Sequence, residues 1–151
     1  MERKIKVILL EDNSEESKMF QDFINKRNDI TLSSKTKSSN EALILVKKHS
    51  PDAIILDLEL HEGNGSGFDF LNSLKHLSLS YRPLIIVTTN IASQVIYDKL
   101  HKDFVDLIFY KKQSDYSPKL VIDTLVLLAQ EPNLKPIAYN LSLIHISEPT
   151  R

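Results

Sequence analysis

The chain has 151 residues, 42% of them hydrophobic and 26% charged, which is typical of a globular protein long enough to bury a core. Nineteen basic and twenty acidic residues give a formal charge of −1, so we expect no direct binding to nucleic acid. The absence of cysteine excludes a disulfide framework, a thiolate zinc site and a cysteine nucleophile. No apolar run approaches the roughly 18 residues of a membrane span. No signal-peptide core follows Met1 either, so we expect a cytoplasmic protein that does not bind membranes.

The end of the chain differs in character from the rest. Residues 141–151 (LSLIHISEPTR) resemble the in-frame translation of a sequencing-adapter end, and we interpret them as a non-native tail. The alternative is a native tail of the same sequence. Two prolines between residues 131 and 140 are typical of a linker. We therefore expect one domain at residues 2–130, followed by a linker at 131–140 that leads to an output domain beyond Asn140.

Strand and helix patterns alternate along the chain. Four short runs rich in Ile, Leu, Val and aromatic residues are typical of strands buried on both faces of a parallel sheet, and a weaker run lies between the first two. The first two helical patterns begin with residue pairs at capping-box spacing, Asn13 with Glu16 and Ser38 with Glu41. The expected strand–helix pairs are 5–10 and 14–27, 30–34 and 39–49, 53–58 and 67–77, 84–89 and 93–100, and 107–110 and 117–130. This order predicts an α/β fold, a doubly wound five-stranded parallel sheet with right-handed crossovers and helices on both faces. Among the strand orders of such sheets, we expect the flavodoxin-like order 2-1-3-4-5.

Polar residues follow the carboxyl ends of four strands, which is where doubly wound sheets bind ligands. They are Glu11 and Asp12 after the first strand, Asp57 at the third, Thr88 and Thr89 at the fourth, and Lys111 and Lys112 after the fifth. In the order 2-1-3-4-5, the first and third strands are neighbours about 4.8 Å apart, so Asp12 and Asp57 meet at one edge of the sheet. Three carboxylates in one crevice repel one another unless a divalent cation neutralises them. Mg²⁺ is the natural choice because it takes oxygen ligands and leaves room for a phosphoryl oxygen.

These residues lie in motifs that resemble those of the receiver domain of two-component response regulators, over nearly all of residues 4–130. The motifs are LLED, IILD, IIVT and IFYK, at the ends of the first, third, fourth and fifth strands. The resemblance implies a signalling module, not an enzyme, that accepts a phosphoryl group on Asp57 in a Mg²⁺-dependent reaction. The donor would be a sensor histidine kinase or a phosphotransfer protein. The domain would then change conformation to control an output domain or partner.

The resemblance also implies individual roles for the matching residues. Asp12 and Asp57 would bind Mg²⁺ directly, with the backbone carbonyl of Glu59 as a third ligand, and Glu11 would hold a metal-bound water. Thr88 would donate its hydroxyl to the phosphoryl group, and Lys111 would pair with a phosphoryl oxygen. The chemistry agrees, since phosphoryl transfer needs an oxygen nucleophile and positive charge near the equatorial oxygens.

The sequence departs from the receiver pattern after the fifth strand. Lys112 stands where most receivers have proline, and it is an alternative to Lys111 as the site lysine. Three residues before Lys111 is Ile108, where many receivers carry a switch Tyr or Phe. Phe109 would take that position only if Lys112 were the site lysine. The loop after Asp57 is also longer than usual, and we interpret its glycines at residues 63–67 as a loop feature instead of a phosphate cradle.

Other functions remain open at this point. A phosphorylation-independent interaction module with the same fold would have a broken site, whereas all five positions here are intact. A haloacid-dehalogenase-like phosphatase would need a second Asp two residues after the nucleophile, where Glu59 stands, and fewer strand–helix units before it. For the receiver, we expect a homodimer or partner surface on the fourth helix, fifth strand and fifth helix, with Tyr97, Phe109 and Tyr116 as contact aromatics.

Overall fold

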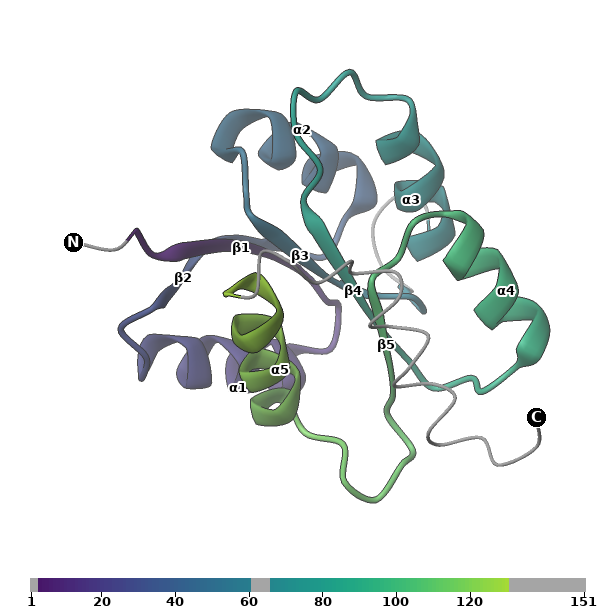
Figure 1. Ribbon diagram of the computed structural model, residues 1–151. Coiled ribbons are helices and arrows are strands. Elements are labelled where there is room, and N and C mark those ends of the chain that lie inside the picture. The colour runs from purple at the N-terminus through teal and green to yellow at the C-terminus, as the bar shows by residue number, and fades with distance from the viewer. Residues whose placement is uncertain (1–2, 61–65, 131–151) are drawn as a thin grey trace.

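The computed structural model describes residues 3–60 and 66–130, and within them five strands alternate with five helices (Figure 1). The elements are β1 (Ile5–Leu10), α1 (Ser14–Asn25), β2 (Ile30–Thr36), α2 (Ser39–His49), β3 (Ala53–Asp57), α3 (Gly67–Lys75), β4 (Leu84–Thr89), α4 (Gln94–Lys102), β5 (Leu107–Tyr110) and α5 (Pro118–Ala129). The predicted linker at 131–140, the tail at 141–151 and most of the glycine-containing loop lie outside the described residues.

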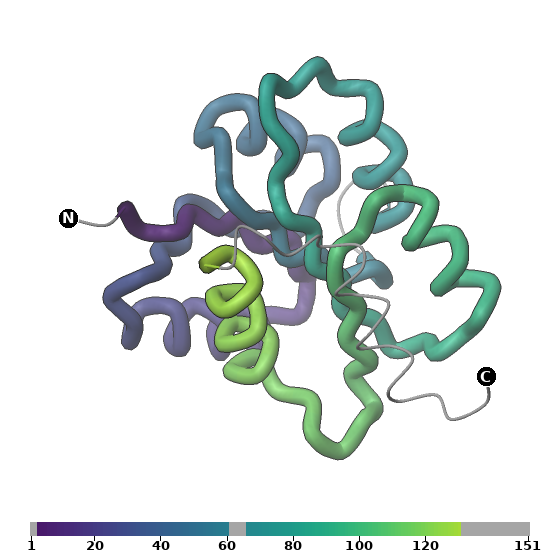
Figure 2. The backbone as a smooth tube through the Cα atoms, viewed as in Figure 1, coloured from purple at the N-terminus to yellow at the C-terminus, as the bar shows by residue number. Residues whose placement is uncertain are grey.

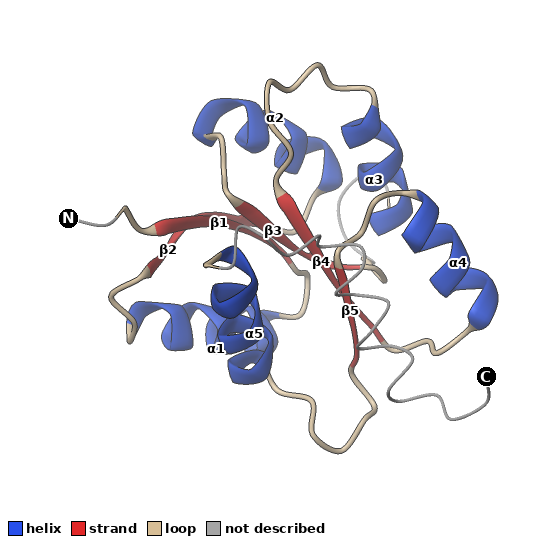
Figure 3. Cartoon of the chain, in the orientation of Figure 1, coloured by secondary structure: helices blue, strands red, loops and turns tan. Residues whose placement is uncertain are grey.

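The strands form one parallel sheet in the order β2-β1-β3-β4-β5, which confirms the predicted fold class and strand order. Helices α1 and α5 cover one face of the sheet, and α2, α3 and α4 cover the other (Figure 3). The chain path brings α1 and α5 side by side, although they are the first and last helices in the sequence (Figure 2). The sheet order reverses between β1 and β3, so a site at that point draws on both halves of the chain.

Alternate residues of each strand point to opposite faces, and each face buries its own apolar cluster. In β1, Ile8 and Leu10 pack under α2 to α4, whereas Val7 and Leu9 pack under α1 and α5. All four side chains are fully buried, which explains why the strand is a continuous apolar run instead of an alternating one.

The helix caps form where the sequence places them. The Asn13 side chain accepts a hydrogen bond from the Glu16 backbone N–H at 2.8 Å, and Ser38 accepts one from the Glu41 N–H at 3.3 Å. These bonds satisfy donors that the first turn of a helix leaves without an intrahelical partner. The cap at Asn13 begins α1 directly after β1, and it places the first turn of α1 beside the strand ends.

Two expectations need correction. Strand β2 continues to Thr36, two residues beyond the predicted end, because the backbone pairing with β1 extends to Leu10. Tyr97, expected as a surface contact aromatic, has only 6% of its surface exposed and belongs to the core under α2 to α4. Its aromatic character therefore serves packing, and the exposed apolar residues near the start of α4 are Ile91 and Val95.

Candidate functional site

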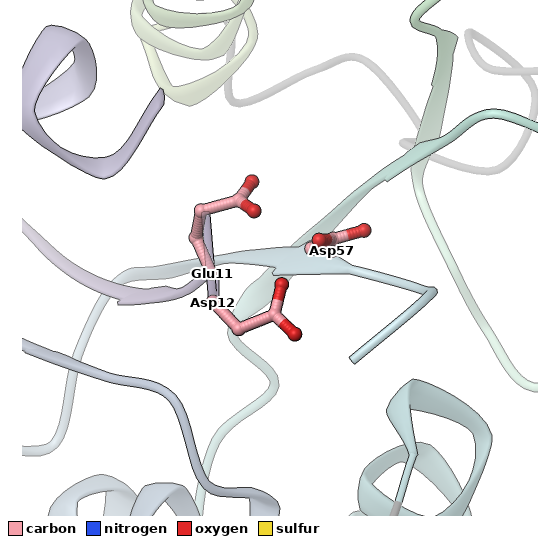
Figure 4. Close-up of side chains that lie close together, drawn as sticks. All are labelled: Glu11, Asp12 and Asp57. Carbon is pink, nitrogen blue, oxygen red and sulfur yellow. The ribbon is translucent and has the colours of Figure 1, made fainter. Parts of the chain in front are cut away.

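Three carboxylates meet at the carboxyl ends of β1 and β3 (Figure 4). Leu10 of β1 pairs with Leu56 of β3, so the residues that follow them, Glu11 and Asp57, emerge side by side. Each of Glu11, Asp12 and Asp57 offers a carboxylate oxygen that lies within 4.8 Å of the others. An all-oxygen set of this kind suits a hard divalent cation such as Mg²⁺, which binds through few carboxylates and keeps several waters. The residues therefore fit the expected metal.

Burial makes this cluster electrostatically unfavourable without a cation. Glu11 is 2% exposed and Asp57 is 4% exposed. Burial, with the neighbouring Asp57 carboxylate, raises the pKa of Glu11 to about 8. Burial also raises the pKa of Asp57, although Lys111 and the Glu59 N–H, which donates to Asp57 Oδ1 at 3.1 Å, oppose that shift. A cation at this position would remove the repulsion that favours protonation.

Lys111 brings a positive charge to the same cluster from the end of β5. Its backbone N–H donates to the Thr89 carbonyl at 2.8 Å, which fixes the residue beside β4. Its Nζ lies 3.3 Å from Glu11 Oε1 and 3.6 Å from Asp57 Oδ2. Burial alone would lower the pKa of Lys111, but the surrounding carboxylates outweigh that effect and raise it. Lys112, the alternative site lysine, is exposed on the following turn.

Thr88 lies beside Asp57 on the neighbouring strand. The two residues pair in the β3–β4 register, and Leu58 N–H donates to the Thr88 carbonyl at 2.9 Å. The Thr88 side chain is fully buried, and its Oγ1 has no hydrogen-bond partner within the described structure. A buried hydroxyl without a partner is unfavourable, so this donor is available for an acceptor that arrives next to Asp57.

Glu59 and Thr89 form a separate contact. The Glu59 carboxylate accepts hydrogen bonds from the Thr89 hydroxyl and from the Asn90 N–H, the latter at 2.8 Å. The side chain of Glu59 therefore ties the β3–α3 loop to the β4–α4 loop. The role predicted for its backbone carbonyl as a metal ligand stays a prediction.

The position three residues before Lys111 is aliphatic and buried. Ile108 is 7% exposed and packs with the cluster under α2 to α4. Phe109 points to the opposite face and packs against the cluster under α1 and α5. Because Lys111 is the lysine that lies at the carboxylates, Ile108 occupies the position where many receivers have a switch aromatic.

Two residues contact this site although the sequence did not predict them there: Glu16, and Tyr116, which was expected only as a contact aromatic of the partner surface. Glu16, in the first turn of α1, places its Oε1 3.2 Å from Lys111 Nζ. Tyr116, just before α5, donates its hydroxyl to Glu16 Oε2. Burial and this carboxylate raise the pKa of Tyr116. From the sequence, only the capping interaction of Glu16 with Asn13 could be predicted. The contacts of Glu16 with Lys111 and Tyr116 could not, because they join residues 95 and 100 positions apart.

Comparisons with known proteins agree with this geometry. The family model "Response regulator receiver domain" matches residues 7–116. The polar-differentiation response regulator DivK of Brucella ovis is 37% identical over 83 residues, which is 54% of this chain and 64% of DivK. A protein-glutamate methylesterase/protein-glutamine glutaminase of Burkholderia pseudomallei is 28% identical over 128 residues, or 80% of this chain. The match spans only 34% of that relative.

Solved structures share the fold. The response regulator domain of Thermotoga maritima CheB matches with a TM-score of 0.71 at 19% identity, covering 89% of this chain and all of that one. A DNA-binding response regulator of the LuxR family from Staphylococcus aureus matches with a TM-score of 0.69 at 20% identity, covering 83% and 99% of the two chains. No helix among the described residues has the length and apolar character needed to cross a membrane. The match to the family model, together with the site at the strand ends, shows that this chain belongs to the response regulator receiver domains, the signalling modules of two-component systems.

Proposed function

We propose that Asp57 accepts a phosphoryl group from a phosphohistidine of a sensor histidine kinase or a phosphotransfer protein. The observation that carries this proposal is that the Lys111 ammonium and the unpartnered Thr88 hydroxyl both lie beside one buried carboxylate, that of Asp57. A carboxylate oxygen of Asp57 attacks phosphorus, and the new O–P bond replaces the P–N bond of the donor. The electron pair of the broken bond leaves with the imidazole, which takes up a proton.

The site residues have distinct roles in that transfer. The Lys111 ammonium pairs with an oxygen of the phosphoryl group, and it offsets the charge that arrives at Asp57. The Thr88 hydroxyl donates a hydrogen bond to another phosphoryl oxygen. Asp12 and Asp57 would hold Mg²⁺ with the Glu59 carbonyl as a further ligand, and Glu11 would hold a metal-bound water. Mg²⁺ would supply positive charge to the carboxylates and to the phosphoryl oxygens.

Phosphorylation would be transmitted through the β4–α4 loop. When the Thr88 hydroxyl turns toward the phosphoryl group, the backbone that follows it is free to shift, and that backbone carries the Asn90 contact with Glu59. The affected surface includes Ile91, which is 46% exposed, and Val95, which is 78% exposed. We infer that this surface, with β5 and α5, binds a second copy or a partner in the phosphorylated state. Such coupling is typically about 1–3 kcal/mol, so the unphosphorylated domain samples the active state to a small extent.

Labelling with a radioactive small phosphodonor such as acetyl phosphate tests the acceptor. We expect Mg²⁺-dependent, hydroxylamine-sensitive label on the wild type and none on Asp57→Asn. Asp22→Asn is the matched control, because the Asp22 side chain is 52% exposed on α1 and lies in a surface ion pair with Lys18. Label that persists on Asp57→Asn, or full labelling of the wild type in EDTA, would contradict the assignment.

Amide hydrogen exchange with beryllofluoride and Mg²⁺ tests the transmission. We expect altered protection at residues 88–102 as well as around Asp12 and Asp57. If protection changes only around the two aspartates, the domain binds the phosphoryl mimic without transmitting it through this surface. That result would favour an interaction module in which phosphorylation does not control the partner surface.

A further inference from the structure

Lys111 contacts three carboxylates, of which two belong to the candidate metal site and one does not. Its Nζ lies 3.3 Å from Glu11, 3.6 Å from Asp57 and 3.2 Å from Glu16. Glu11 and Asp57 belong to the carboxylate cluster suited to a metal ion, and Glu16 does not. Glu16 is therefore a partner of Lys111 whose charge is not shared with that cluster.

This difference matters once a divalent cation is bound. Glu11 and Asp57 attract the Lys111 ammonium only while their own charges are uncompensated. Two positive charges added beside them offset most of the negative charge of the cluster and weaken this attraction, and the low exposure of Lys111, 11% for its side chain, leaves little solvent screening. The attraction of Glu16 remains, because its carboxylate lies on the α1 side of the ammonium and outside the cluster.

The Glu16 carboxylate is itself held in place. The Tyr116 hydroxyl donates to Oε2, whereas Lys111 contacts Oε1, so the two partners occupy different oxygens. The Tyr116 ring packs against the apolar cluster under α1 and α5. On the other side, the Asn13 cap fixes the backbone of Glu16 in the first turn of α1. The carboxylate has little freedom to turn away from Lys111.

We propose that Glu16 is a positioning residue that keeps the Lys111 ammonium in the phosphorylation site when the metal is bound, with Tyr116 orienting its carboxylate. The inference rests on the proposed function of Lys111 as the partner of a phosphoryl oxygen. Without Glu16, the weakened attraction to the metal-bound carboxylates would leave Lys111 free to turn toward solvent, and the phosphoryl group would meet an incomplete site.

A double-mutant cycle on the labelling rate of Asp57 tests the proposal. Loss of one charge-assisted contact should slow Mg²⁺-dependent labelling of Glu16→Gln about fivefold. In a Lys111→Ala background, the same substitution should have no further effect, because Glu16 acts through Lys111. Glu15→Gln is the matched control, since Glu15 carries the same charge on the exposed side of the same helix turn and should label at the wild-type rate. Tyr116→Phe should slow labelling in the same direction but less, because the ion pair remains.

The Lys111 side-chain NMR signals provide a readout that is independent of labelling. On titration with Mg²⁺, we expect the wild-type Lys111 signals to stay distinct from those of exposed Lys112, and the Glu16→Gln signals to move toward them. Identical Lys111 signals in the two proteins, equal rates for the Glu15 and Glu16 variants, or additive effects in the cycle would overturn the proposal. If the wild type is not labelled at Asp57 at all, the proposed function fails, whereas the NMR comparison still decides whether Glu16 retains the lysine. Urea unfolding of each variant shows whether a slower rate reflects loss of folding.

Discussion

Replacing Lys111 with methionine should destabilise the metal-free protein strongly and the Mg²⁺-bound protein much less. Methionine preserves most of the buried aliphatic stem and removes the charge. In the metal-free protein, the substitution leaves Glu11 and Asp57 buried without their shared cation. When Mg²⁺ is present, it supplies positive charge to the same two carboxylates, so the loss of the ammonium matters less.

The contacts of Lys111 set the size of the effect. A single unit-charge pair at 3.6 Å, the Lys111–Asp57 distance, is worth about 5 kcal/mol at an effective dielectric constant of about 20. Desolvation of the ammonium opposes this attraction, and breaking a buried pair typically costs about 3–5 kcal/mol in total. Because burial raises the pKa of Glu11 to about 8, this carboxyl is largely protonated at neutral pH in the metal-free protein, and it leaves no second unpaired charge when the lysine is lost. The loss is therefore at the lower end, about 3 kcal/mol at neutral pH.

Urea unfolding at neutral pH, with EDTA or with excess MgCl₂, measures both values. Lys112→Met is the control, because Lys112 is exposed and its loss should change the free energy of unfolding by less than about 0.5 kcal/mol. The reasoning is refuted if Mg²⁺ leaves the Lys111→Met defect unchanged or enlarges it. It is also refuted if the two lysine variants are equally destabilised, since the ion pairs of Lys111 would then add nothing to the free energy of unfolding beyond the effect of losing an exposed lysine.

Three further outcomes follow from the same geometry. In the folded metal-free protein Glu11 keeps its proton up to about pH 8, whereas in the unfolded chain it loses the proton near the ordinary pKa of 4.5. The free energy of unfolding should therefore fall as pH rises between these two values, and urea titrations should show a smaller fall with Mg²⁺. Thr88→Val should leave the urea midpoint unchanged or slightly raised, because the hydroxyl has no partner, yet it should abolish the beryllofluoride-induced change in hydrogen exchange at residues 88–102. Gly67→Ala should cost about 1–3 kcal/mol in urea unfolding, because an added Cβ would lie 2.8 Å from the Leu58 Cα; an unchanged midpoint would mean that the β3–α3 connection yields readily.

Strands β1, β3 and β4 were predictable because most of each strand is buried on both faces and is therefore apolar. Val7 to Leu10 and Ile54 to Leu56 show this directly, with almost no exposed surface. The crossover rules predicted a doubly wound sheet, whereas the strand order 2-1-3-4-5, which brings Asp12 and Asp57 to one edge, was expected by analogy with flavodoxin-like sheets. The end of β2 was harder to predict, since the carboxyl-terminal half of the strand is polar. Its length depends on backbone pairing with β1, which no local pattern indicates.

The residues that the sequence did not reveal act across large separations in the chain. Glu16 looks like any acidic residue in the first turn of a helix, where negative charge is favourable in its own right. Its contacts with Lys111 and Tyr116 exist because α1 and the β5–α5 loop meet at one end of the sheet. Tyr97 shows the opposite case, since an aromatic residue on a surface helix was expected to bind partners and instead fills the core beneath α4.

Two unfavourable features of the resting site point in the same direction. Within residues 3–60 and 66–130, the buried Thr88 hydroxyl has no hydrogen-bond partner, and the carboxylates of Glu11 and Asp57 are crowded beside Lys111. Each is costly in the isolated domain, and under the proposed function each would be relieved by the same event, because a phosphoryl group would offer an acceptor to Thr88 while Mg²⁺ would compensate the carboxylates. The free energy released at the site would then be available to bias the β4–α4 loop, which begins just after Thr88 and contains Asn90. A receiver whose site were already satisfied at rest would bind the phosphoryl group with less change in that loop, so we propose that the imperfect resting site connects phosphorylation to a conformational response.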